Sequence, residues 1–331
     1  MRTQVAQSSI QIGIVLYPGV QMASVLGLTD LFEMANRVAL SDISRAVPLL
    51  RVTHWQQASA VCEPVCVFDS AASSDSERSV SQIRVLILPP MLGNPSDMPE
   101  LSLLASWLLS QHASGATLGS VCAGAFLLAQ TKLLDHRQIT THWAHAEALQ
   151  RRFPNVRIDT DRLVIDDGDI ITAGGLMSWC DLGLRVIARC LGSTIMQETA
   201  RTLLVDPPGR EQRYYSVFTP NFTHGDAAIL KLQHWLQATQ AKEISLPILA
   251  AQANLTERTL LRRFFKATGM TTTEYCQRLR VSRARDILQF TNVSIDRVAW
   301  DVGYADAGAF RKVFARIVGL SPGDFRRRFA A

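Results

Sequence analysis

Residues 249–269 read LAAQANLTERTLLRRFFKATG, and residues 298–319 read VAWDVGYADAGAFRKVFARIVG. The two stretches align at an offset of 49 residues before an internal turn and 50 residues after it. In each, the apolar spacing predicts a short helix, a tight turn and a second helix. Asn254 and Gly303 stand where the turn needs a left-handed backbone, which these two residue types tolerate best. The C-terminal region is therefore predicted to be all-α, with two helix-turn-helix motifs.

The second helix of each copy has an apolar face and a basic face. We expect the apolar residues to pack inward: Leu260, Leu261, Phe264 and Phe265 in the first copy, and Phe310, Val313, Phe314 and Ile317 in the second. A basic helix face is often only a solvated surface, but two copies behind turns of the right length favour recognition helices. The residues predicted to contact DNA are Arg258, Thr259, Arg262, Arg263, Lys266, Asp306, Gly308, Arg311 and Lys312.

The charge of the chain is divided unevenly. Residues 240–331 hold 16 Lys and Arg against 8 Asp and Glu, a net charge of +8. Residues 1–239 hold 18 against 21, a net charge of −3. A polyanionic partner is therefore expected for the C-terminal region alone, although the charge does not distinguish DNA from RNA or a membrane surface.

The repeat closely resembles the DNA-binding domain of AraC/XylS-type transcription regulators over about 226–329. The signature includes Gly303-Tyr304-Ala305-Asp306 and the closing run 319–326, GLSPGDFR. The resemblance implies that a connecting helix, here about 272–290, carries both helix-turn-helix units. One monomer would then contact two successive major-groove segments of double-stranded DNA. Because Ala307-Gly308-Ala309 is small and apolar, we expect the first unit to specify sequence and the second to contact mainly the DNA backbone.

The N-terminal half alternates short apolar strands with helices. Strands are expected at 10–16, 49–54, 61–68, 83–88, 116–121, 139–141, 163–166 and 170–173, and helices at 21–38, 99–113, 143–152 and 176–190. Continuous apolar strands separated by helices indicate an α/β doubly wound, flavodoxin-like domain. We place this domain at 10–204 and a Pro/Gly-rich linker at 205–225, before the DNA-binding domain at 226–331.

Residues 118–126, LGSVCAGAF, place Cys122 between an apolar strand and a helix. With Thr141-His142-Trp143 and the run 172–175, TAGG, this stretch resembles the class I glutamine-amidotransferase-like, or PfpI-type, domain fused to such regulators. The resemblance covers about 10–200. It implies a ligand-sensing pocket at the carboxyl ends of the strands, for a small metabolite such as an amino acid or an amine.

Cys122 supports two interpretations. A thiol before a helix N-terminus favours the thiolate, and His142 with Asp30 would complete a hydrolase trio. The sensing interpretation is preferred because a regulator gains nothing evident from consuming its signal, so no catalysis is expected. The ligand pocket is then predicted to contain Cys122, Ala123, His142, Trp143 and Asp30.

No metal site or cofactor is expected. His142 and His145 have a spacing common by chance, and the six cysteines form no C-x-x-C pair. The N-terminus lacks an apolar segment typical of a secretory signal, and no apolar run approaches the length of a membrane span, so a cytoplasmic protein is predicted.

The sequence therefore predicts a transcription regulator that binds DNA sequence-specifically under the control of a small molecule. A homodimer is expected, and RNA polymerase is a further candidate partner. Two alternatives remain: a PfpI-like cysteine hydrolase or amidase with a nucleic-acid-binding tail, and a DNA-binding protein whose first domain only dimerises.

Overall fold

The computed structural model describes residues 9–41, 47–57, 62–71, 82–207, 209–242 and 244–330. The chain divides into two compact units between Gln212 and Arg213, a point inside the stretch predicted as a linker. Each unit has its own hydrophobic cores. Across the described ranges, no helix is both long and apolar enough to span a bilayer.

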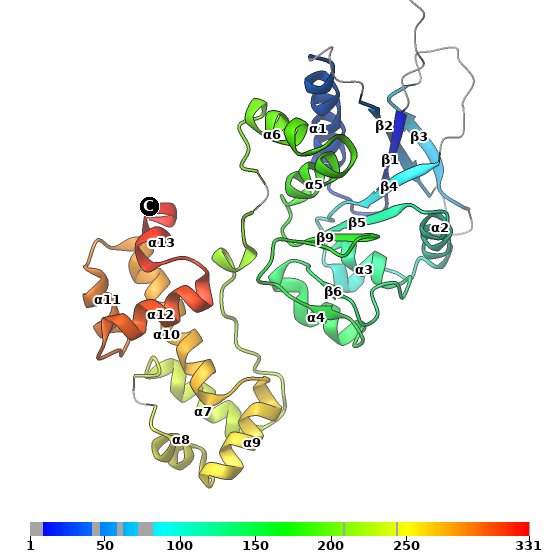
Figure 1. Cartoon of the computed structure of the whole chain (residues 1–331). Coiled ribbons are helices and arrows are strands. Elements are labelled where there is room, and N and C mark those ends of the chain that lie inside the picture. The colour runs from blue at the N-terminus through cyan, green and yellow to red at the C-terminus, as the bar shows by residue number, and fades with distance from the viewer. Residues whose placement is uncertain are drawn as a thin grey trace, which may run out of the picture. The chain divides into compact units, whose positions relative to one another are not determined.

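A seven-stranded sheet forms the centre of the first unit (Figure 1). Its strand order is β3-β2-β1-β4-β5-β9-β8, in which the five central strands are parallel and the two edge strands antiparallel. The strand order reverses between β1 and β4, as in doubly wound folds. The strands are β1 (Ser9–Leu16), β2 (Leu49–Gln56), β3 (Val65–Asp69), β4 (Ile83–Leu88), β5 (Thr117–Val121), β8 (Val164–Asp166) and β9 (Ile170–Ala173).

Helices cover both faces of this sheet. Along β1, Ile12 and Ile14 enter the core with the first group of helices, whereas Val15 enters the core on the opposite face. A central strand buried on both faces is apolar without alternation, which explains the run IQIGIVL. The first face carries α1 (Met22–Ser41), α5 (Trp179–Leu191) and α6 (Ser193–Thr202), and the second carries α2 (Ser102–Ala113), α3 (Gly124–Ala129) and α4 (Ala146–Arg152).

Three details differ from the sequence predictions. The strand expected at 139–141 is not in the main sheet, because β6 (Gln138–Ile139) pairs with β7 (Arg157–Ile158) in a separate two-stranded sheet. The helix expected at 143–152 begins as a 3-10 turn, η2 (Trp143–His145). The predicted strand 61–68 begins outside the described residues, and its observed part, β3, is an exposed edge strand.

The second unit is helical, as the repeat predicts. Its helices are α7 (Ala227–Ala238), α8 (Leu246–Ala253), α9 (Glu257–Thr268), α10 (Thr272–Phe290), α11 (Ile295–Asp301), α12 (Ala307–Val318) and α13 (Pro322–Phe329). One core lies under α7, α8 and α9, and another lies under α11, α12 and α13. α10 contributes Tyr275 to the first core and Leu288 to the second, so the predicted connecting helix is confirmed.

Candidate functional site

The first helix-turn-helix unit is built from α8 and α9. Asn254 closes α8 in the left-handed conformation with φ of 53°, as the sequence predicts. Thr256 caps α9, since its side chain accepts a hydrogen bond from the backbone N–H of Thr259. Leu260 and Phe264 are fully buried, which fixes α9 against the core by a narrow apolar ridge.

The outward face of α9 differs from the prediction. The apolar spacing predicts Leu261 and Phe265 in the core, but their exposed fractions are 43% and 58%. Each lies about 100° around the helix from the buried residue before it, Leu260 or Phe264, and among the described residues no helix buries it. Of the predicted DNA contacts on α9, Thr259 and Arg263 are only partly exposed. The residues of α9 that are exposed are Glu257, Arg258, Leu261, Arg262, Phe265 and Lys266.

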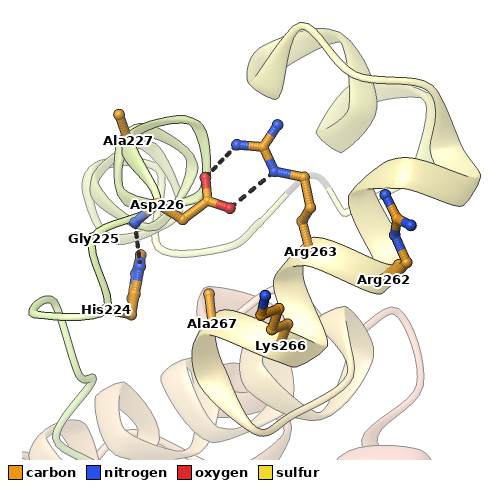
Figure 2. A pocket seen from close by; sticks show the side chains of 8 residues that line it. All are labelled: His224, Gly225, Asp226, Ala227, Arg262, Arg263, Lys266 and Ala267. Atoms are coloured by element: carbon orange, nitrogen blue, oxygen red, sulfur yellow. Dashed lines mark hydrogen bonds and ion pairs between the residues drawn. The ribbon is translucent and has the colours of Figure 1, made fainter.

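A cleft of about 680 Å³ lies between α9 and the start of α7 (Figure 2). Arg263 spans it, donating from Nε and from one terminal nitrogen to the Asp226 carboxylate over 2.9 and 2.6 Å. This pair lowers the pKa of Asp226, which also caps α7. Arg262 points away from Asp226 (Figure 2). The structure thus separates two adjacent arginines that the sequence treats alike, because Arg263 is engaged within the protein.

The second helix-turn-helix unit is built from α11 and α12. Gly303 adopts φ of 87° in the turn, as predicted, and Asp306 caps α12 by accepting from the backbone N–H groups of Gly308 and Ala309. Asp306 is therefore a structural cap in this state. Arg311 donates to Asp296 at 2.5 Å, and both side chains are largely exposed. Arg311 and Lys312 supply exposed positive charge on a helix that begins with three small residues.

Arg280 on α10 contacts residues of both helix-turn-helix units. This buried guanidinium donates to the backbone oxygens of Ala241 and Lys242 at 2.8 and 2.9 Å. It also lies over the ring of Tyr304, 5.2 Å from the ring centroid. A side chain at Gly303 would meet the same guanidinium at 3.3 Å. This contact is not predictable from the repeat pattern, because Arg280 belongs to neither copy of the repeat.

In the N-terminal unit, Cys122 occupies a sharp elbow between β5 and α3. Its φ of 52° is unusual for a residue with a side chain. The backbone holds it there: Cys122 N–H donates to Ala173 O at 2.7 Å, and Thr141 Oγ1 donates to Cys122 O at 2.8 Å. Gly124 admits no side chain, because a Cβ there would collide with the Leu88 carbonyl.

The elbow follows β5, the strand next to β4 and thus one strand away from the point where the strand order reverses. Tyr17 follows β1 and donates its hydroxyl to the carbonyl of Pro89, which follows β4. Burial raises the pKa of Tyr17, and the proximity of Cys122 raises it further. Burial also raises the pKa of the Cys122 thiol to about 11, outweighing the backbone N–H groups of Ala123 and His142. The prediction that the helix N-terminus favours a thiolate is therefore wrong, because desolvation is the larger effect.

The three members of the supposed hydrolase trio do not assemble. Burial and the neighbouring His145 lower the pKa of His142, whose Nδ1 accepts the backbone N–H of Ala144 at 3.1 Å. The neutral ring then carries its proton on Nε2, where it donates rather than accepts. Asp30 lies exposed on α1, and in the part of the chain that the structure describes no hydrogen bond or ion pair joins it to Cys122 or His142.

A clasp between the linker and the elbow region is a feature that the sequence did not reveal. Gln212, only 2% exposed, donates to Thr141 O and Thr160 O at 3.0 and 3.1 Å and accepts from the backbone N–H of Trp143 at 2.9 Å. Beside it, Arg210 forms an ion pair with buried Asp181 at 2.6 Å. We refer to residues 210–212 as the clasp. The clasp binds the segment after β6, which contains His142 and Trp143.

Gln21 is a second feature missed at the sequence level. Its backbone N–H donates to Pro90 O at 2.8 Å, which places it beside the Tyr17–Pro89 contact. Its side-chain Oε1 is buried yet has no hydrogen-bond partner among the described residues. A buried acceptor without a donor is costly, so this atom is suited to receive a donor from a ligand.

Among the residues that the structure describes, no group of three or more His, Cys, Asp or Glu is placed to hold a metal ion.

Comparison with known families divides the chain in the same way. Residues 69–189 match the DJ-1/PfpI family, and residues 249–328 match a helix-turn-helix domain. The HTH-type transcriptional regulator GlxA of Rhizobium meliloti is 29% identical, over 71% of this chain and 73% of its own length. The regulator GbdR of Pseudomonas aeruginosa is 29% identical over 67% of this chain and 60% of its own length, so the match spans less than two thirds of GbdR.

Among solved structures, an AraC family transcriptional regulator from Pseudomonas putida is 20% identical, with a TM-score of 0.44, over 59% of this chain and 99% of that one. The two family matches agree with the two domain types predicted from the elbow and from the repeat. A PfpI-type α/β domain followed by an AraC-type helix-turn-helix domain is therefore confirmed.

Proposed function

We propose that this chain, a DNA-binding transcription regulator that joins a DJ-1/PfpI domain to an AraC-type helix-turn-helix domain, changes its binding to an operator when the first domain binds a small polar metabolite. The curated relatives that match across much of the chain are transcriptional regulators rather than enzymes. The raised pKa of Cys122 and the proton-donating role of His142 also argue against nucleophilic catalysis.

Operator binding rests on the exposed faces of α9 and α12. Arg258, Arg262 and Lys266 on the first helix and Arg311 and Lys312 on the second are exposed and placed to meet phosphates or guanine edges. Buried aromatic residues anchor each helix from behind. Two such helices on one connecting helix would let a monomer contact double-stranded DNA at two places, and a homodimer would double that number.

The unpartnered Gln21 Oε1 is the observation that carries the ligand proposal. It lies where the carboxyl ends of β1 and β4 diverge, the usual ligand position in doubly wound sheets. Tyr17, in the same turn after β1, lies close to Cys122, which in turn is near the backbone N–H of His142. A ligand with an N–H or O–H donor would satisfy Gln21 Oε1. An amino acid or a primary amine has this chemistry, and the Trp143 ring would favour a cation.

The clasp offers a route from the ligand to the linker. Gln212 hydrogen bonds directly to the backbone of Thr141 and Trp143, on either side of His142. A ligand that moves residues 141–143 would distort the hydrogen bonds of Gln212. The conformation of the linker that follows Gln212 would then change. Such a ligand would change operator affinity only through its different affinity for the two linker states.

A thermal-shift screen of amino acids and amines on the full chain, followed by operator titrations with the compounds that raise Tm, tests the proposal. The variant Gln21→Leu should lose the ligand response yet bind DNA as before, whereas Cys122→Ser should keep both. A Tm shift that persists in Gln21→Leu would place the ligand elsewhere. Failure of the full chain to bind any duplex sequence-specifically would overturn the regulator assignment.

A further inference from the structure

Leu261 is an apolar side chain at the border of the basic residues on α9. It is 43% exposed, and its neighbours on the helix surface are Arg258, three residues before it, exposed Glu257, four before it, and exposed Phe265, four after it. The described part of the chain places no core residue over it, since the adjacent core is closed by Leu260 and Phe264. Burial within the protein therefore does not explain a leucine at this position.

The second helix-turn-helix unit provides an internal control. At the 50-residue offset, Leu261 corresponds to Arg311 and Phe265 to Ala315. The exposed face of α12 has no large apolar residue, whereas that of α9 has two. The scaffold is shared between the copies, so it does not require a leucine here. The difference belongs to the surface that each helix presents.

We propose that Leu261 contacts the C5-methyl group of a thymine in the operator. This inference rests on the proposed DNA binding and adds a base preference to it. In the major groove the thymine methyl is the one apolar group on a base edge, and aliphatic side chains recognise it. Leu261 lies in the N-terminal half of the recognition helix, where residues of helix-turn-helix proteins meet base edges.

Charge complementarity identifies DNA as the partner of this face. Arg258 and Arg262 lie on the same side of Leu261, with Glu257 on its other side, while Arg263 is bound to Asp226. A protein partner recognised through Leu261 and Phe265 alone would not need two guanidinium groups beside them, whereas a duplex offers phosphates or guanine edges beside the methyl. The expected operator therefore has a thymine adjacent to the position read by Arg262.

The test begins with selection of a preferred duplex from a random pool by the full chain. Each thymine of the selected site is then replaced singly by deoxyuridine, which removes only the methyl group. At one thymine the replacement should weaken binding about fourfold, the value for one buried methyl group. In the variant Leu261→Ala the same replacement should have no effect, which makes the two changes non-additive.

Ile248→Ala is the matched control, because Ile248 is an exposed aliphatic residue on α8 rather than on the recognition helix. It should keep the full uracil effect. Unchanged Tm values for both variants would show that the domain folds normally. If no duplex is selected, the proposed function fails. If a duplex is selected but no uracil effect depends on Leu261, the DNA-binding assignment stands and the methyl contact is wrong.

Discussion

The two helix-turn-helix units share a scaffold and differ in their surfaces. Phe264 and Phe314 are both fully buried, and Asn254 and Gly303 both supply the left-handed turn. Outside, α9 presents basic residues beside the exposed apolar pair Leu261 and Phe265, whereas α12 begins with small residues and presents Arg311 and Lys312. Core packing requires the buried residues that the two copies share, whereas the exposed positions are not constrained by packing and differ between the two recognition helices.

The largest effect is expected from the shared scaffold. Phe264→Ala and Phe314→Ala should each destabilise their own half by about 3–5 kcal/mol, the cost of an aromatic cavity in a core. Because the two phenylalanines belong to separate cores, hydrogen exchange should accelerate over 227–270 in the first variant and over 295–329 in the second. Uniform acceleration in both variants would show that the cores unfold as one.

The next largest effect is expected from Arg280, which contacts both helix-turn-helix units. Arg280→Ala removes two hydrogen bonds from a charged donor and leaves the Ala241 and Lys242 carbonyls without it, at a cost of about 2–3 kcal/mol. Operator affinity should fall in addition, because the two recognition helices lose a fixed relation. Arg280→Lys is the control and should restore part of the stability. Titration with one-site and two-site duplexes measures the coupling, and an equal loss on both would contradict it.

The third prediction separates the recognition helices. Arg262→Ala should cost about 1–3 kcal/mol of operator binding and relax the preference at one base pair. Lys312→Ala should weaken binding about equally on all sequences and reduce the salt slope by about one. Competition between single-base operator variants distinguishes the two outcomes. A base-specific loss in Lys312→Ala would give sequence reading to the second unit as well.

The smallest effect is expected from disrupting the ion pair between Asp226 and Arg263. Asp226→Asn retains a helix cap and releases the guanidinium, so binding to any duplex should strengthen and the salt slope should steepen by about 0.9. Arg263 lowers the pKa of Asp226, so the stability from the pair is present above the unfolded pKa of about 3.9 and lost as pH falls through the folded value.

Urea unfolding of wild type and Asp226→Asn between pH 7 and pH 3 measures this dependence. The stability difference between the two proteins should narrow below about pH 4. The variant Arg263→Gln serves as the control, because it lacks the same pair and should show the same narrowing. A constant difference down to pH 3 would mean that folding does not lower the pKa of Asp226, and it would contradict stabilisation by the ion pair.

Much of the fold follows from local patterns. The repeat predicts both turns and the connecting helix, and the apolar runs predict the central strands. The two edge strands and the small sheet were less accessible, because pairing direction depends on partners distant in the chain. Leu261 and Phe265 were misplaced because helical periodicity identifies an apolar sector, whereas the neighbouring helices determine how much of that sector is covered.

The two domain types, the duplicated recognition helices and the thiol elbow follow from the amino-acid sequence, since each depends on residues close together in the chain. The ion pair that distinguishes Arg263 from Arg262 depends on tertiary packing, because Asp226 lies 37 residues from Arg263. So do the raised pKa of the Cys122 thiol and the burial of Gln21 Oε1 without a hydrogen-bond partner among the described residues. Burial and hydrogen bonding depend on what surrounds a group in space, and residues far apart in the sequence supply those surroundings.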